Sequence, residues 1–301
     1  MATASGQWAW VLRVLLPIAI GSTWPADARA CARQGPREGF LLEPGTILPS
    51  NVSGFAWAGV VPKRNGEQVL PPVDLFKVEF AASPGDASTS PSLPVPIPFD
   101  LRLDPRAAEV TVIVTPRAGI VAGATYRLTF KRRNAPGFPL PDREEGALTG
   151  EIQTIDVSIS RDAMTPPPAR GSSVERVGPA KVATLGDSCG ASITAVQQQI
   201  QMKLPAGAER WRSALVYTTK ADGSVWDRDG EALTEPPPAP TWAGPGKRVL
   251  YARCAGDMDS TALAPGPHAV VMTAWLPGTD ITVRGEGRVP LVCKPVRGNA
   301  R

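Results

Sequence analysis

Alternating apolar and polar residues define the clearest element of this chain, which begins at Tyr126. Tyr126, Leu128 and Phe130 alternate with Thr125, Arg127, Thr129 and Lys131. A period of two is typical of a strand that has one face in a core and the other in water. A turn-rich segment, which ends near Gly123, leads into this run. The pattern therefore predicts a half-buried strand that the chain enters through a tight corner.

The same periodicity recurs along most of the chain. It predicts further strands at 73–80, 109–114 and 153–159, and then at 180–185, 193–204, 213–219, 249–254, 268–275 and 287–292. The run at 193–204 contains Gln, Met and Leu, which also favour helices. However, Val196, Ile200 and Met202 share one parity, and Pro205 ends the run, so a strand is favoured. Pro-Gly and Asp-Pro pairs fall between the runs as turn signals.

Composition supports an all-β chain and excludes some partners. The 301 residues include 33 Pro and 29 Gly, and proline is poorly tolerated in helix interiors but accepted in turns and edge strands. The formal net charge is +4, with basic residues scattered except for Lys131-Arg132-Arg133. We therefore expect an ordinary soluble surface and no nucleic-acid partner.

The N-terminus predicts export. Residues 1–30 have the features of a signal peptide: an apolar run at Val14–Ile20, then small residues at Ala28 and Ala30 that permit cleavage before Cys31. That run is too short for a membrane span, and no later run is long enough. A lipid anchor on Cys31 is the alternative to a soluble mature protein, but Arg29 fits a lipoprotein signal poorly.

The remaining chain divides into two units of ordinary domain size. We predict a first domain at 44–160, a linker at 161–177, a second domain at 178–293 and a basic tail at 294–301. The linker contains Pro166-Pro167-Pro168 followed by a Ser/Gly-containing stretch. Prolines stiffen such a spacer, whereas serine and glycine loosen it.

Two stretches of the first unit resemble the bacterial Ig-like domains of secreted and surface proteins. The segment EPGTILPSNVSGFAW, 43–57, resembles the opening of such domains, and AGATYRLTF, 122–130, resembles their corner before a late strand. The resemblance implies that the Tyr126 hydroxyl anchors that corner. A related pattern at 262–274, ALAPGPHAVVMTA, puts His268 at a second corner. The fold expected is two tandem immunoglobulin-like β-sandwiches.

Four cysteines in an exported chain predict disulfides, for which three pairings exist. There is no Cys-x-x-Cys spacing that would favour a zinc or redox site. In the Ig-like scheme that the resemblance implies, the start of the second strand lies beside the end of the fifth. This predicts a Cys189–Cys254 bridge and leaves Cys31 to pair with Cys293.

Catalytic and metal-binding motifs are incomplete. Gly186-Asp187-Ser188-Cys189-Gly190 resembles nucleophile blocks of serine hydrolases, and His268 is the only histidine that could act as base. Neither the trypsin-like residue order nor a lipase-like Asp-x-x-His is present. Asp222-Gly223, Asp227-x-Asp229-Gly230 and Asp257-x-Asp259 could bind calcium, but Asp-Gly is also a strong hairpin-turn signal.

The sequence therefore predicts a non-catalytic, exported protein of the bacterial envelope or exterior, without a cofactor. Its role would be structural, adhesive or ligand-binding, with an envelope protein or a polysaccharide as partner. Two alternatives stay open: a serine hydrolase that uses Ser188 and His268, and a calcium-dependent binding module.

Overall fold

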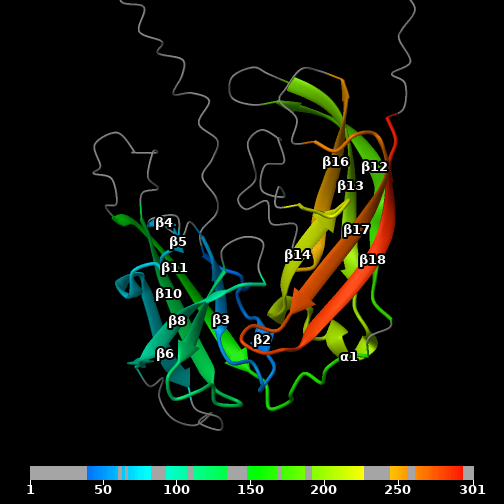
Figure 1. The fold of residues 1–301 in the computed structure, drawn as a ribbon. Coiled ribbons are helices and arrows are strands. Elements are labelled where there is room, and N and C mark those ends of the chain that lie inside the picture. Colours follow the sequence, from blue (N-terminus) through cyan, green and yellow to red (C-terminus); the bar gives the residue numbers. More distant parts are fainter. Residues whose placement is uncertain are drawn as a thin grey trace, which may run out of the picture.

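The computed structural model describes residues 39–59, 63–64, 67–82, 93–106, 111–133, 148–168, 171–186, 192–226, 245–255 and 262–293. These residues are nearly all β, as predicted, and Figure 1 shows them as two β-rich bodies side by side. We call residues 39–159 the N-terminal half and residues 173–293 the C-terminal half. No helix among the described residues is long and apolar enough to cross a membrane.

The N-terminal half consists of two main sheets and a small ribbon. Its strands are β1 (Gly39–Phe40), β2 (Ile47–Leu48), β3 (Phe55–Ala58), β4 (Lys63–Arg64), β5 (Glu67–Gln68), β6 (Phe76–Ala82), β7 (Val95–Pro96), β8 (Phe99–Asp104), β9 (Thr111–Pro116), β10 (Thr125–Arg133) and β11 (Leu148–Ile159), with a 3-10 turn, η2, at Val73–Leu75. One sheet has the order β1-β3-β9-β8 and the other the order β2-β11-β10-β6-β7; β4 and β5 form the ribbon. All pairs are antiparallel except β2 with β11.

The core of this half lies between the two sheets. Phe55 and Trp57 of β3 face Tyr126 and Phe130 of β10, with ring centroids 5.5 Å apart for Phe55–Tyr126 and 5.1 Å for Trp57–Phe130. The apolar parity predicted for β10 is confirmed, because Tyr126, Leu128 and Phe130 are all buried. Strand β8 was not predicted, although Phe99, Leu101 and Leu103 alternate there with polar residues.

The C-terminal half begins earlier than predicted. Its strands are β12 (Ser173–Gly186), β13 (Ser192–Lys203), β14 (Val216–Ala221), β15 (Ser224–Val225), β16 (Lys247–Ala255), β17 (Gly266–Trp275) and β18 (Thr282–Leu291), with a short helix α1 (Ala206–Glu209) and a 3-10 turn, η3, at Arg212–Ala214. Because β12 starts at Ser173, residues 173–177 belong to a strand and not to the linker. In the same way, β1 lies before residue 44, where the first domain was predicted to start.

The strands of the C-terminal half form one sheet in the order β15-β14-β17-β18-β12-β13-β16. Strands β12 and β18 are joined by a single parallel pair, Ser173 with Glu286. The sheet therefore folds over into two layers, with Ile200 and Met202 of β13 and Met272 and Ala274 of β17 buried in the core. Strand β13 confirms the strand prediction for the glutamine-rich run.

The buried side chain of Gln198 forms hydrogen bonds at a bulge between β12 and β13. The register between β12 and β13 shifts between Val177 and Lys181, and Gly178 has a φ of +68°. The Gln198 side chain points inward and donates from Nε2 to the carbonyl oxygens of Gly178 and Gln199, at 3.1 and 2.9 Å. These bonds satisfy carbonyls that the bulge removes from the ladder.

The disulfide prediction was wrong. Cys254 is bonded to Cys293, with the two Cα atoms 5.5 Å apart, which rules out both Cys189–Cys254 and Cys31–Cys293. The antiparallel β13–β16 pairing behind the first prediction is present. However, Cys254 lies at a bulge in β16, and a bulge changes the direction in which a side chain points. Cys254 therefore packs together with Cys293 against the core. Cys31 and Cys189 lie outside the described residues.

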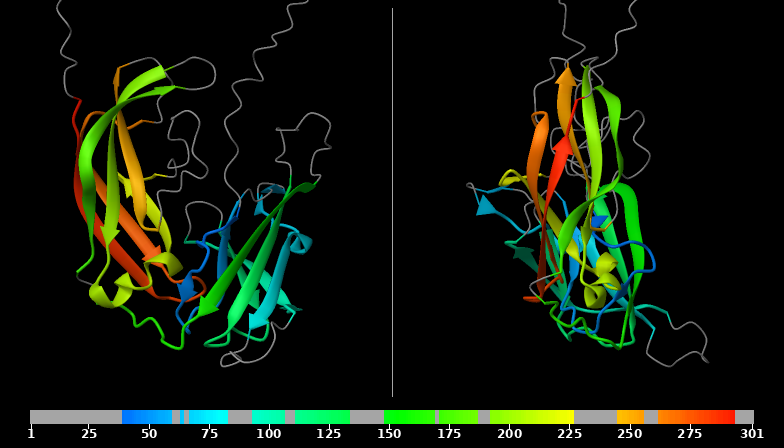
Figure 2. Two further views of the ribbon diagram at one scale, coloured as in Figure 1. Left: turned by 180° about the vertical axis from the view of Figure 1, so that it is seen from behind. Right: turned by 90° about the vertical axis from the view of Figure 1, so that its right-hand side faces the viewer.

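The two halves contact each other at one end. Figures 1 and 2 show the chain crossing between them there, while the opposite ends of the two bodies diverge. The β17–β18 hairpin lies at the contact end and points toward the N-terminal half.

Candidate functional site: the joint between the two halves

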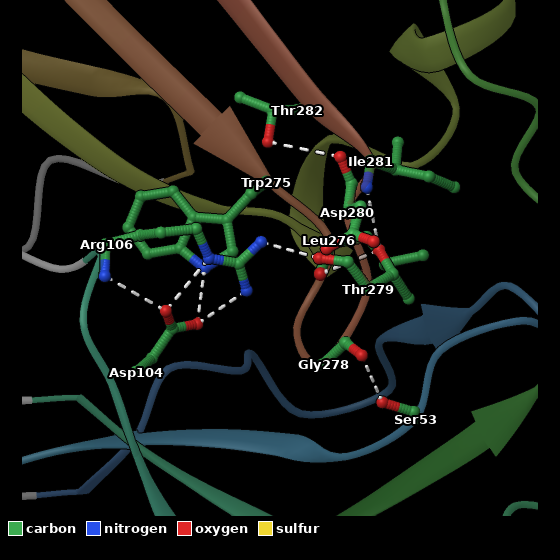
Figure 3. Close-up of polar contacts among 10 residues, drawn as sticks. All are labelled: Ser53, Asp104, Arg106, Trp275, Leu276, Gly278, Thr279, Asp280, Ile281 and Thr282. Atoms are coloured by element: carbon green, nitrogen blue, oxygen red, sulfur yellow. Dashed lines mark hydrogen bonds and ion pairs between the residues drawn. The ribbon is translucent and has the colours of Figure 1, made fainter.

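The joint is built by the β17–β18 hairpin of the C-terminal half and the β8–β9 and β2–β3 connections of the N-terminal half (Figure 3). The hairpin loop is braced internally by Thr279. Its hydroxyl donates to the carbonyl oxygen of Leu276 at 3.0 Å and accepts from the backbone N–H of Ile281 at 3.1 Å. The loop therefore presents a fixed shape to the other half.

Asp104 is the polar centre of the joint. Its carboxylate accepts from Arg106 through Nε at 2.9 Å, Nη2 at 2.7 Å and the backbone N–H at 3.1 Å. It also accepts from the indole Nε1 of Trp275 at 2.9 Å, which is a bond between the two halves (Figure 3). The Asp104 side chain is only 2% exposed, so four donors replace the water it loses.

Arg106 connects the same centre to the hairpin backbone. Its Nη1 donates to the carbonyl oxygen of Thr279 at 2.5 Å, and its guanidinium carbon lies 5.5 Å from the centroid of the Trp275 ring. The guanidinium thus contacts Asp104, Thr279 and Trp275 at once. Such a planar fork suits one bidentate pair together with a cation–π contact.

The electrostatic result is a carboxylate that stays ionised. Burial by itself raises the pKa of Asp104, but the hydrogen bonds and positive charge of Arg106, together with the bond from Trp275, outweigh it and lower the pKa below its ordinary value. The charged form is therefore the one that the joint stabilises.

An apolar contact surrounds the polar centre. Trp275 is fully buried in a cluster with Ala56 of β3, Ile113 of β9 and Val216 of β14, and Leu41 packs against it. Ala56 and Ile113 lie on the outer face of their sheet, since Phe55, Trp57, Val112 and Val114 fill the inner face. The C-terminal half therefore buries a sheet face that would otherwise meet water.

A glycine permits the closest approach of the two backbones. Ser53 donates its hydroxyl to the carbonyl oxygen of Gly278 at 2.6 Å, and its N–H donates to that of Pro277 at 3.3 Å. Gly278 has a φ of +76°, and a Cβ at this position would overlap Ser53 Oγ. Beside this contact lies a small cleft of about 260 Å³, lined by Arg102, Asp104, Arg106, Gly278, Thr279 and Asp280, among others.

The segment between the halves is anchored as well. The Asn51 side chain donates to the carbonyl oxygen of Met164 and accepts from its N–H, both at 2.9 Å, while the Met164 side chain is buried. Asp162 pairs with Arg210, with Oδ2 and Nη1 3.0 Å apart. These contacts hold residues 162–164 against both halves.

The predicted corner residues have clear structural roles. The Tyr126 hydroxyl accepts from the backbone N–H of Val121 at 2.9 Å, across the turn that precedes β10. His268 is buried at the start of β17, where Nδ1 lies 2.6 Å from Asp222 Oδ2 and Nε2 lies 2.7 Å from the carbonyl oxygen of Ala264. Both neighbours of the imidazole are hydrogen-bond acceptors. The side chain therefore links the β14–β15 turn, through Asp222, and the segment before β17, through Ala264, to strand β17.

The remaining candidate residues do not come together in the described part of the chain. Ser188, Asp227, Asp229, Asp257 and Asp259 lie outside it. Asp222 and Gly223 form the two-residue turn between β14 and β15, and both have positive φ angles, which is typical of an Asp-Gly hairpin. Within the described ranges, no three His, Cys, Asp or Glu side chains gather as a metal site would require.

The residues of the joint were missed by sequence reasoning. The sequence predicts only a turn at Asp104-Pro105 and only the end of a strand at Trp275. The available signal was the alternation of Phe99, Leu101 and Leu103 before Asp104, which marks an edge strand that ends in a carboxylate. Nothing in the sequence pairs Asp104 with Trp275, which lies 171 positions away.

No protein-family model and no curated protein sequence matches the chain. Among solved structures, one match is to the crystal structure of the N-terminal part of the bacterial S-layer protein SbsC. It is 14% identical with a TM-score of 0.21, and the match covers 84% of this chain and 43% of that one. Because a TM-score of 0.21 does not establish a shared fold, the function proposed below rests on the geometry of this chain.

Proposed function

We propose that this chain is an exported, non-catalytic protein in which two Ig-like sandwiches are held at a fixed angle to present their surfaces to an envelope partner. The observation that carries the proposal is the joint. Fully buried Trp275 and nearly buried Asp104 are bonded to each other from opposite halves. A flexible tether would not need such a contact, whereas a rigid two-module scaffold does.

The strand order supports the Ig-like part of the proposal. In the N-terminal half, one sheet corresponds to strands A-B-E-D and the other to A′-G-F-C-C′ of an immunoglobulin variable-type scheme. The parallel pair β2–β11 corresponds to A′ and G. The C-terminal half corresponds to A-B-E and G-F-C-C′, with the single β12–β18 pair where A meets G. The Tyr126 corner fits the same scheme.

The disulfide supports export. Stable disulfides are typical of oxidising compartments outside the cytoplasm, and Cys254 near the end of β16 is bonded to Cys293, which follows β18. Together with the signal-like residues 1–30, this favours the periplasm, the cell surface or the medium.

The geometry of His268 weighs against the hydrolase alternative. Both ring nitrogens are occupied by acceptors, and the side chain is 7% exposed. A general base needs one nitrogen free to receive the nucleophile's proton. No observation on the described residues favours calcium, since Asp222 accepts from the backbone N–H of Ala269 and faces His268.

Export can be tested by expressing the full chain with its own N-terminus in a Gram-negative host. We expect the protein outside the cytoplasm, with a mass that begins at Cys31 and carries no lipid. A diacylglycerol mass on Cys31 would replace the soluble form with an anchored one, and an uncleaved cytoplasmic chain would overturn export.

The non-catalytic role can be tested with the same purified protein against short-chain ester substrates. We expect no turnover above that of the Ser188→Ala variant. Hydrolysis that disappears with Ser188→Ala would establish the hydrolase instead.

A further inference from the structure

Three glutamines form a regular row on the outer face of the layer made by β12, β13 and β16. Gln197, Gln199 and Gln201 alternate along β13 with Gln198, Ile200 and Met202, which point into the core. Positions two apart on a strand lie about 6.8 Å from each other. The row therefore presents three amides along roughly 14 Å of β13, the central strand of this layer.

The outward amides differ from the inward one in their bonding. Gln198 satisfies its amide with backbone carbonyls inside the sandwich. The amides of Gln197, Gln199 and Gln201 make no hydrogen bond to another described residue, and their side chains are partly exposed. Each can therefore both donate to and accept from an external polar group.

The neighbouring strands supply charge and apolar surface in register. Lys181 lies opposite Gln197, and Lys247 lies opposite Gln201. Gln199 is flanked by Val177 on β12 and Val249 on β16. Figure 1 shows the three strands next to one another.

The face has an excess of positive charge. Its described strands carry the basic side chains Lys181, Lys203 and Lys247 and the acidic side chain Glu175. Glu175 is paired with Lys203, with Nζ and Oε1 3.4 Å apart. Lys181 and Lys247 have no acidic partner among the described residues.

We propose that this glutamine face binds an anionic polysaccharide. The amides match the hydroxyl groups of sugars, the two lysines match carboxylates or other anionic groups on the chain, and the valines match the apolar faces of sugar rings. A polar strip that follows one strand suits an extended polymer. A protein partner fits less well, because the centres of protein interfaces are depleted in lysine and enriched in aromatic anchors.

The inference deepens the proposed binding role and rests on it, but it can fail separately. A chain that is exported and rigid yet ignores polysaccharides would overturn only the glutamine face. A chain that is not exported would overturn the proposed function, whatever it binds.

The first test is affinity electrophoresis and calorimetry of the full chain with polygalacturonate as an anionic probe and dextran as a neutral one. We expect retardation by polygalacturonate that weakens as salt rises from about 50 to 300 mM, because exposed charges are then screened. We expect no retardation by dextran. Equal retardation by polyglutamate would show that charge alone acts, or that the partner is an acidic protein, and would overturn the polysaccharide assignment.

The second test distinguishes binding at the glutamine face from attraction to the overall positive charge of the protein. The triple variant Gln197→Ala, Gln199→Ala, Gln201→Ala should bind at least about tenfold more weakly, as three lost hydrogen bonds imply. Lys181→Gln with Lys247→Gln should lose binding similarly. Lys220→Gln is the matched control, because Lys220 is exposed on β14 of the other layer and its side chain has no partner among the described residues.

The control should bind like the parent protein. Unchanged binding by the triple variant, with its β-sheet circular dichroism intact, would overturn the proposal. An equal loss in Lys220→Gln would overturn it too, because it would indicate diffuse attraction and not this face.

Discussion

A single carboxylate shows how this molecule uses burial at the residue scale. Asp104 is removed from water, which by itself disfavours the charged form. Arg106 and Trp275 donate to both of its oxygens, and the net effect is a lowered pKa. The bonds from Arg106 are local, two positions away in sequence, whereas the bond from Trp275 exists only when the halves meet. Asp104 therefore couples the end of β8 to the docking of the other half.

Replacing the charge at this position should weaken the protein. Asp104→Asn keeps the side-chain shape but leaves Arg106 without its ion pair, and loss of one partner of a buried pair costs about 3–5 kcal/mol. Since Arg106 is partly exposed and Asn still accepts one bond, we expect a loss of about 2–3 kcal/mol in the free energy of unfolding by urea.

Asp100→Asn is the matched control for this experiment. Asp100 also pairs with an arginine, Arg117, but both side chains are more than half exposed, so the expected loss is no more than about 1 kcal/mol. Equal losses in the two variants would show that Asp104 makes no special contribution.

The lowered pKa of Asp104 also predicts an acid-dependent loss of stability. Its stabilising contribution is present above the pKa of the unfolded chain, about 3.9, and is lost as the pH falls through the lower pKa of the folded state. The unfolding free energies of the wild type and Asp104→Asn should therefore converge as the pH falls from about 6 to about 2.5. A difference that stays constant over this range would mean that Asp104 does not titrate with folding.

At the element scale, the β17–β18 hairpin has two functions. Its strands belong to the C-terminal sheet, with His268 opposite Val289 and Trp275 opposite Thr282. Its loop contacts the N-terminal half through Gly278 and Thr279, and Trp275 at the end of β17 contacts it through Asp104. The internal bonds of Thr279 keep the loop in shape, so a change in the loop should alter docking more than folding.

Gly278→Ala should open the joint. The new Cβ would overlap Ser53 Oγ and lie 2.8 Å from Arg102 Nη2, in addition to the cost of a positive φ. We expect a larger radius of gyration in small-angle X-ray scattering, with β-sheet circular dichroism retained.

Gly119→Ala provides the comparison for that variant. Gly119 has a φ of +78° and no atom within 4 Å of the Cβ position. It should lose about 1–2 kcal/mol of stability from the backbone alone and keep the parental radius of gyration. An unchanged radius in Gly278→Ala would contradict the assigned role of the loop.

At the scale of the whole molecule, the halves are joined by more than the chain that connects them. The hairpin, the Asp162–Arg210 ion pair and the Asn51–Met164 bonds lie at the same end of the molecule, and one apolar core cluster includes residues of both halves. These contacts join the two bodies at one end, and they support the proposed fixed angle between them. The proline-rich spacer at 166–168 is predicted to be the most protease-sensitive point outside the termini.

Asn51→Ala should expose the connecting segment to proteolysis. It removes both bonds to the Met164 backbone, so residues 162–168 should open more often. We expect thermolysin to convert the variant into two stable fragments faster than it converts the wild type. Asn51→Asp keeps the acceptor for the Met164 N–H and should be intermediate. Equal cleavage rates in all three proteins would show that Asn51 does not hold the segment.

The sequence by itself determined the all-β class, the position of most strands and the Tyr126 corner. These features depend on the alternation of a strand and on local turn chemistry, which act over a few residues. Strand β13 shows this well, since the parity of Val196, Ile200 and Met202 outweighed its helix-forming composition. Tertiary structure alone decided the pairing of Cys254 with Cys293 and the bond between Asp104 and Trp275. Both depend on how whole layers and halves pack, because partners far apart in sequence are selected by the faces that pack together and not by spacing along the chain.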